Sequence, residues 1–174
     1  MKEIRSIYLK NLFIDGSFGS VILGTNLDRV RLLFKEATAE YEYSPNSLVL
    51  VYGNIEFFFR DRVLNCISWH PNLCTYDPYL PNAGSIDLDP WIVWNGLTMV
   101  EAERELIASS IEFRKVTIPE GLTYEGDSVV ELITNCNTRL IFRGFLDWYL
   151  ECFELSRGIK IDTPLESFLE FYTY

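Results

Sequence analysis

The sequence predicts an α+β fold: two tandem α-β-β-β repeats whose antiparallel sheets pack on helices, followed by a short C-terminal helix. Two stretches, FFFRDRVLNCIS at 57–68 and LIFRGFLDWYLECFE at 140–154, share Phe-Arg before a turn and Leu-x-Cys after it. An amphipathic helical pattern precedes each stretch, and such internal similarity indicates a repeated unit. The 174 residues are therefore expected to form a single domain. Its parts are repeat one at about 1–70, a linker at about 71–95, repeat two at about 96–155 and the C-terminal helix at about 163–172.

The first repeat is predicted from changes of periodicity along residues 1–70. Residues 1–23 contain two apolar runs around Asp15-Gly16, which predicts a hairpin. Residues 24–41 predict an amphipathic helix of about three turns, with Asn26 as its N-cap. Residues 47–71 predict a three-stranded meander that turns at Gly53-Asn54 and again at Arg60-Asp61-Arg62. Because side chains alternate along a strand, Phe57 and Phe59 should share one face and Phe58 the other.

The second repeat follows the same order. An offset of 72 aligns Gly96 with Gly24 and Met99 with Leu27. Thr98 and Glu101 form a capping-box signature for its helix. Residues 115–128 are interpreted as a larger loop, and residues 129–154 as three strands. The alternative is a chance agreement between two generic αβββ stretches.

The linker differs in composition, since it holds four of the seven prolines, and it is predicted to be irregular. Aromatic side chains next to carboxylates are suited to binding a basic protein partner. The candidate partner-binding residues are Trp69, Tyr76, Asp77, Tyr79, Asp87, Asp89, Trp91 and Trp94. The alternative is that these aromatic rings fold inward and cover the gap between the repeats.

The formal net charge is −10 and the isoelectric point is near 4.6, and these values argue against nucleic acid as a partner. Such a surface repels nucleic-acid phosphates and attracts basic proteins, although acidity also serves solubility alone. The sequence contains no apolar run of about 18 residues, so no membrane span is expected. Its N-terminus resembles no secretory signal, and a cytoplasmic location is expected. The oligomeric state is left open.

The residues indicate no catalytic, metal or cofactor site, so the protein is not expected to be an enzyme. Cys66-x3-His70-x3-Cys74 has the residue types of a zinc site, but only three ligands occur together. His70 is interpreted as a surface histidine. Arg60 and Arg143 occupy equivalent repeat positions and serve either as turn charges or as anchors for carboxylates. In the C-terminal segment, Thr163-Pro164 followed by Glu166 predicts a sharp helix start.

The pattern GSFGSVILGTNLDRVRLLF…LVLVYGNIEFFFRDRVLNCIS resembles small bacterial proteins found among polymorphic-toxin immunity proteins. The tandem helix-plus-sheet layout is also similar to that of the β-lactamase inhibitor proteins. The resemblance to the immunity-protein pattern covers about a third of the chain. The matching positions are Gly16, Phe18, Gly19, Leu23, Gly24, Val30, Tyr52, Gly53, Ile55, Glu56, Phe57 and Phe59. It implies an inhibitor that occludes a toxin and has no catalytic residues of its own.

Together, these observations predict an intracellular protein-binding module, an immunity protein that neutralises a basic toxin by occlusion. The alternative is a small-molecule-binding regulatory module with an aromatic cleft between the repeats. A third possibility is a cysteine- or metal-dependent enzyme that uses His70.

Overall fold

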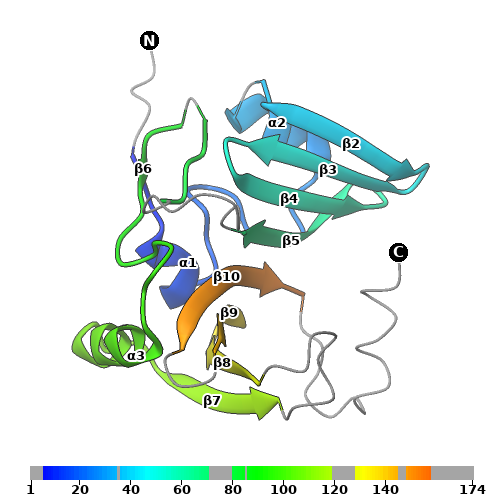
Figure 1. The fold of residues 1–174 in the computed structure, drawn as a ribbon. Helices are drawn as coiled ribbons and strands as arrows, with labels where there is room; N and C mark the ends of the chain where they lie inside the picture. Colours follow the sequence, from blue (N-terminus) through cyan, green and yellow to red (C-terminus); the bar gives the residue numbers. More distant parts are fainter. Residues whose placement is uncertain are drawn as a thin grey trace.

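The structure, a computed structural model, describes residues 6–34, 36–70, 80–84, 86–118, 128–144 and 148–157. In these residues the fold is α+β and is dominated by one antiparallel sheet of eight strands in the order β2-β3-β4-β5-β10-β9-β8-β7 (Figure 1). The helices are α1 (Lys10–Ile14), α2 (Leu27–Phe34) and α3 (Met99–Ala108). The sheet strands are β2 (Ala39–Ser44), β3 (Ser47–Tyr52), β4 (Ile55–Arg60), β5 (Val63–Trp69), β7 (Phe113–Ile118), β8 (Val129–Thr134), β9 (Thr138–Arg143) and β10 (Tyr149–Ser156). A separate parallel pair joins β1 (Ile7–Tyr8) to β6 (Leu88–Asp89).

The predicted turns and faces of the first meander are confirmed. β3 and β4 join at residues 53–54, and β4 and β5 at residues 61–62. Phe57 and Phe59 are buried on the core face, whereas Phe58 on the opposite face is half-buried. The Asn26 side chain accepts a hydrogen bond of 2.9 Å from the Asp28 N–H and caps α2 as expected.

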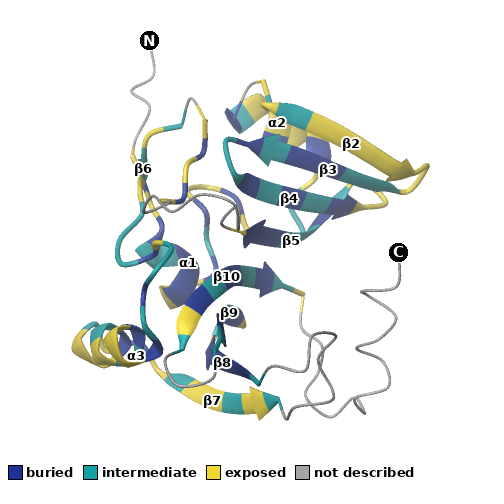
Figure 2. Cartoon of the chain, viewed as in Figure 1, coloured by how far each residue is buried: buried dark blue, intermediate teal, exposed yellow. Residues whose placement is uncertain are grey.

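The expected count of three strands per meander is wrong, because α2 and α3 are each followed by four strands of the sheet. The additional strands are β2 and β7, which form the two outer edges of the sheet. Neither contains a buried residue, as the exposed outer strands in Figure 2 illustrate. An outer strand has a neighbour on one side only, so its sequence lacks the closely spaced buried apolar residues that mark an inner strand.

The hairpin predicted for residues 1–23 is also wrong, because α1 occupies the first of its two apolar runs. Leu9, Leu12 and Phe13 recur at helical spacing and are all buried. Only the isolated bridge between Phe18 and Val21 resembles the expected hairpin.

The two meanders join edge to edge through β5 and β10. These strands are antiparallel and place Trp69 opposite Phe153 and Ile67 opposite Leu155. The indole of Trp69 stacks on the Phe153 ring, with centroids 5.9 Å apart. The sheet therefore continues through the junction without a gap.

Hydrogen bonds join helices α2 and α3 to their own meanders at equivalent positions. The Leu64 N–H donates to the Thr25 carbonyl at 2.9 Å, and the Leu150 N–H donates to the Leu97 carbonyl at 2.9 Å. A second hydrogen bond of 2.9 Å joins the same segments in each half. The Leu27 N–H donates to the Arg62 carbonyl, and the Met99 N–H donates to the Trp148 carbonyl. In each half, the start of the helix is therefore joined to the start of the last strand.

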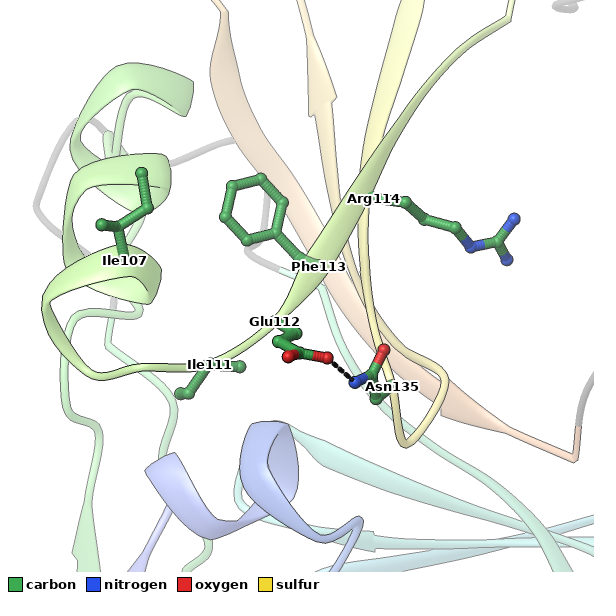
Figure 3. Close-up of a pocket in the computed structure, with 6 residues that line it drawn as sticks. All are labelled: Ile107, Ile111, Glu112, Phe113, Arg114 and Asn135. Atoms are coloured by element: carbon green, nitrogen blue, oxygen red, sulfur yellow. Dashed lines mark hydrogen bonds between the residues drawn. The ribbon is translucent and has the colours of Figure 1, made fainter.

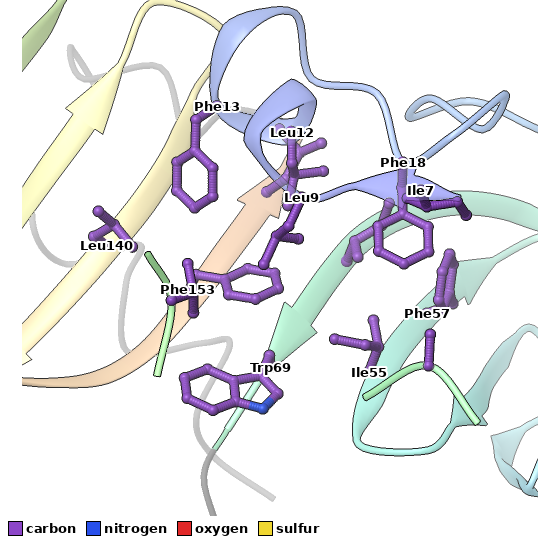
Figure 4. Close-up of a cluster of buried hydrophobic side chains, with 14 of the residues drawn as sticks. Ile7, Leu9, Leu12, Phe13, Phe18, Ile55, Phe57, Trp69, Leu140 and Phe153 are labelled. Atoms are coloured by element: carbon purple, nitrogen blue, oxygen red, sulfur yellow. The ribbon is translucent and has the colours of Figure 1, made fainter. Parts of the chain in front are cut away.

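The core is shared between the halves, and α1 lies at their junction (Figure 4). The Phe13 ring meets Phe153 of β10 at 6.1 Å, while Phe18 just after α1 meets Phe57 of β4 at 5.4 Å. The Thr138 hydroxyl on β9 donates to the Leu12 carbonyl, which ties α1 to the second meander. The N-terminal segment therefore contributes to the packing of both meanders.

Parts of the predicted organisation fall outside the described residues. The C-terminal helix at about 163–172 and linker residues 71–79 are among them. The described part of the linker includes strand β6, so this part is not wholly irregular. No helix in the part of the chain that the structure describes is long and apolar enough to cross a membrane.

Candidate protein-binding surface

Trp69, a predicted partner-binding residue, has no exposed surface and cannot meet a partner in this fold. It ends β5 at the junction of the meanders, on the same face as Ile67 and Phe57. The sequence signal for this burial is the spacing of two between Ile67 and Trp69, because side chains two apart in a strand lie on the same face. The inward-folding alternative therefore describes Trp69 correctly.

Asp87 and Asp89 are exposed, and both take part in holding the N-terminal strand. Their carbonyls accept hydrogen bonds from Ile7 N–H at 2.8 Å and from Leu9 N–H at 2.9 Å. The Ser6 hydroxyl donates to the Asp87 carboxylate. Three other predicted residues, Tyr76, Asp77 and Tyr79, lie outside the described residues.

Trp91 is half-buried and held from several sides. The Asp89 carboxylate accepts its backbone N–H at 2.8 Å. Its indole lies 5.4 Å from the Phe13 ring, and the Lys10 ammonium lies 5.4 Å from the indole centroid, a cation–π contact. The indole N–H points to the Glu105 carboxylate of α3 at 3.4 Å. Trp91 thus connects α1 to α3 and keeps one edge accessible.

Trp94 is exposed, and its position depends on Gly96. A Cβ built on Gly96 would lie 2.6 Å from the Trp94 ring, and the Gly96 φ of +126° is one that side chains rarely adopt. Gly96 therefore allows the indole to lie flat against the chain just before α3.

A shallow cavity of about 370 Å³ lies between these tryptophans and α3. Its rim carries the carboxylates of Glu101 and Glu105 with the guanidinium of Arg104 between them in sequence. Glu101 also completes the predicted capping box with Thr98, which is confirmed, and hydrogen bonds from Thr98 lower the pKa of its carboxyl. The full lining consists of Trp91, Ile92, Trp94, Leu97, Glu101, Arg104 and Glu105.

The outward side of α3 continues this apolar character. Val100 and Ile107 have exposed fractions of 59% and 69% and are separated by about two helical turns, so they share a face. At the end of α3, Ile107 and Phe113 border a second shallow cavity of about 450 Å³ (Figure 3). We call the set Trp91, Trp94, Val100, Glu101, Arg104, Glu105 and Ile107 the α3 surface.

The corresponding side of α2 is more polar. The position equivalent to Val100 is Asp28, which forms an ion pair of 2.6 Å with Arg62. One turn further, Arg31 pairs with Glu40 at 2.7 Å. Leu32 is the large apolar side chain that α2 exposes, at 72%. The paired apolar positions of α3 are therefore a difference between two helices that are otherwise placed alike.

Reactive chemistry finds little support among the described side chains. Burial raises the pKa of the Cys66 and Cys152 thiols well above the ordinary value, which disfavours the nucleophilic thiolate. His70 is exposed, and Cys74 lies outside the described residues. In the described ranges, no three His, Cys, Asp or Glu side chains gather as metal ligands would.

A buried ion group, which was not predicted from the sequence, lies on the face of the sheet opposite α1. The Arg139 guanidinium of β9 contacts the Glu154 carboxylate of β10 at 2.5 Å and that of Glu131 on β8 at 3.7 Å. These side chains are only 10% to 16% exposed. The sequence signal for this ion group is Glu131, a single charge within the apolar run VVELIT. The other members, Arg139 and Glu154, lie on two other strands.

Searches against protein family models, curated proteins and solved structures gave no match for this chain.

Proposed function

We propose that this protein is a non-enzymatic inhibitor that binds a basic protein, in the manner of an immunity protein covering a toxin. The observation that carries the proposal is the α3 surface. Trp94, Val100 and Ile107 are each exposed, with exposed fractions of 37%, 59% and 69%. Trp94 lines the cavity beside α3, and Val100 and Ile107 share one face of this helix. Exposed aromatic and apolar side chains with a charged rim are typical of protein-binding surfaces.

The charge of the protein supports a basic partner. Glu101 and Glu105 border the apolar positions, and Asp87 and Asp89 precede Trp91 in sequence. With a net charge of −10, the whole chain would also attract a basic protein over longer distances and speed its association.

No observation favours the small-molecule alternative. Its expected cleft lies between the halves, where Leu9, Leu12 and Phe13 of the α1 segment are packed. The two cavities described above border α3, are shallow and lie outside this junction.

We also infer that the two halves arose from one duplicated unit. The matched hydrogen bonds from Leu64 to Thr25 and from Leu150 to Leu97 support this inference. So does the recurrence of one helix followed by a four-stranded meander.

The direct test uses the purified product of an adjoining gene as the candidate partner. Calorimetric titration against the wild type should give tight binding, and one equivalent should abolish the partner's own activity. We expect Trp94→Ala and Ile107→Asp each to weaken binding at least tenfold, because each removes or charges a central contact.

Leu32→Asp is the matched control, since it places the same charge on an equally exposed apolar residue of α2. It should bind like the wild type, and all three variants should retain the wild-type melting curve. The proposal would be contradicted if no adjoining product bound, or if Leu32→Asp weakened binding as much as Ile107→Asp.

A further inference from the structure

Strand β2 presents an open edge of the sheet to solvent. Within the described residues it pairs only with β3, and every residue after Ala39 is exposed. Tyr41 and Tyr43 have exposed fractions of 53% and 72%. The backbone groups on its outer side therefore have no strand partner in the described structure, and such an edge can accept a further strand.

The sequence of β2 alternates acidic and aromatic side chains, Glu40-Tyr41-Glu42-Tyr43. The pairing with β3 places Glu40 and Glu42 on the core side of the sheet, and Tyr41 on the opposite side. The Glu40 carboxylate pairs with Arg31, whereas no described side chain pairs with Glu42. A strand added here would thus meet carboxylates along one face and phenol rings along the other.

These charges select the occupant. A β2 strand from a second copy would bring glutamates against glutamates, and like charges on facing strands are destabilising. Lysine or arginine facing Glu42 would instead pair with its carboxylate, which no described side chain pairs with, and the next side chain along would lie beside Tyr41. We propose that β2 is the docking edge for an extended basic segment of a partner protein, which adds a ninth strand to the sheet.

This site goes beyond the proposed function, because β2 lies at the far end of the molecule from α3 (Figure 1). A basic strand also exists in this chain: β7, the other outer strand, carries exposed Arg114 and Lys115. Lys115 already pairs with Glu103 at 2.9 Å, so it is less available to a second copy.

The probe is a fluorescein-labelled peptide of alternating lysine and valine, KVKVKVK, and its matched control is KPKPKPK. Both carry the same charge, but proline cannot donate ladder hydrogen bonds. In about 150 mM salt, where exposed charges are screened over roughly 8 Å, we expect anisotropy titrations to give at least fivefold tighter binding of KVKVKVK. Amide NMR shifts should be largest at Ala39–Ser44.

Glu42→Lys should weaken KVKVKVK binding at least fivefold. Glu36→Lys, which makes the same charge change at an exposed residue outside the strand, should leave binding within twofold. Ile107→Asp should also have no effect, which separates this site from the α3 surface. Equal affinity for both peptides, or equal losses in the two lysine variants, would overturn the proposal. So would peptide-free oligomers that disappear in both Glu42→Lys and Lys115→Glu, because they would assign the edge to a second copy.

Discussion

Glu131 is the carboxylate that the described part of the fold buries most deeply, with an exposed fraction of 7%. Burial raises the pKa of its carboxyl above the ordinary value of 4.5, and the nearby Arg139 guanidinium only partly opposes this rise. The folded protein therefore binds a proton at Glu131 more readily than the unfolded chain does. This contribution to stability is full below the unfolded pKa and is lost as the pH rises through the folded pKa.

Glu131→Gln, which removes this titration, predicts a change in pH dependence. The unfolding free energy of the wild type minus that of the variant should be largest below pH 4.5 and decrease toward pH 8. Urea unfolding at a series of pH values measures the difference. Glu101→Gln is a control of opposite sign, because the pKa of Glu101 is lowered and its stabilisation is lost as the pH falls. A difference for Glu131→Gln that is flat across this range would contradict the prediction.

Residue roles were predictable where their cause is local. Thr98, Glu101 and Asn26 act on backbone groups within a few positions, so their capping roles follow from spacing alone. Arg139 meets Glu131 and Glu154 only after three strands have aligned, and sequence spacing cannot express that meeting. The aromatic character of Trp69 indicates a binding residue, but its position two residues after Ile67 in β5 places it on the buried face.

At the scale of elements, the Arg139 ion group links β8, β9 and β10. Arg139→Ala leaves two carboxylates unpaired where little water reaches them, and removing one partner of a buried pair costs about 3–5 kcal/mol. We therefore expect a loss of about 3 kcal/mol in unfolding free energy, measured by urea unfolding at pH 7.

Arg31→Ala is the matched control, since it breaks the Arg31–Glu40 pair, whose side chains are 42% and 48% exposed. Exposed pairs contribute about 0–1 kcal/mol, so this variant should change stability by less than about 1 kcal/mol. Similar losses of unfolding free energy in both variants would show that the Arg139 ion group stabilises the fold no more than an exposed ion pair does.

Elements were predictable in proportion to their burial. The inner strands β3, β4, β8 and β9 each bury several side chains, and their apolar residues are visible in the sequence as runs or, in β4, as an alternation. The outer strands contain no fully buried residue and carry no such run. The short helix α1 was missed because its apolar run is equally compatible with a strand when read over a few residues.

At the scale of the whole molecule, each half depends on the other. The first half has Trp69 at the junction, where Phe153 of the second half covers it, and Phe13 also packs on Phe153. Residues 1–70 alone would expose the rings of Trp69 and Phe13 together with the open edge of β5. We expect this fragment to be unfolded or aggregated, as measured by amide NMR dispersion and sedimentation.

Mixing the fragment during refolding with residues 80–174 should restore the dispersed spectrum of the intact chain, because the β5–β10 pairing re-forms between the pieces. A fragment of residues 1–70 that folds as a monomer would show instead that the first half is self-sufficient.

The sequence predicted the order of elements within each half better than it predicted how the halves meet. Strand parity shows which face of β5 and β10 is apolar, but not which strand lies beside which. That pairing includes the stacking of Trp69 on Phe153 and the packing of α1 at the junction, contacts between residues far apart in the sequence.

The junction between β5 and β10 also bears on how copies of this protein can combine. It joins the final strand of one half to the final strand of the other, and nothing in its contacts requires both strands to come from the same polypeptide. Two molecules that exchanged halves would rebuild the same ladder and the same ring stacking. The fold is therefore compatible with an exchange of halves between two molecules, and dilution would favour pairing of the two halves within one chain.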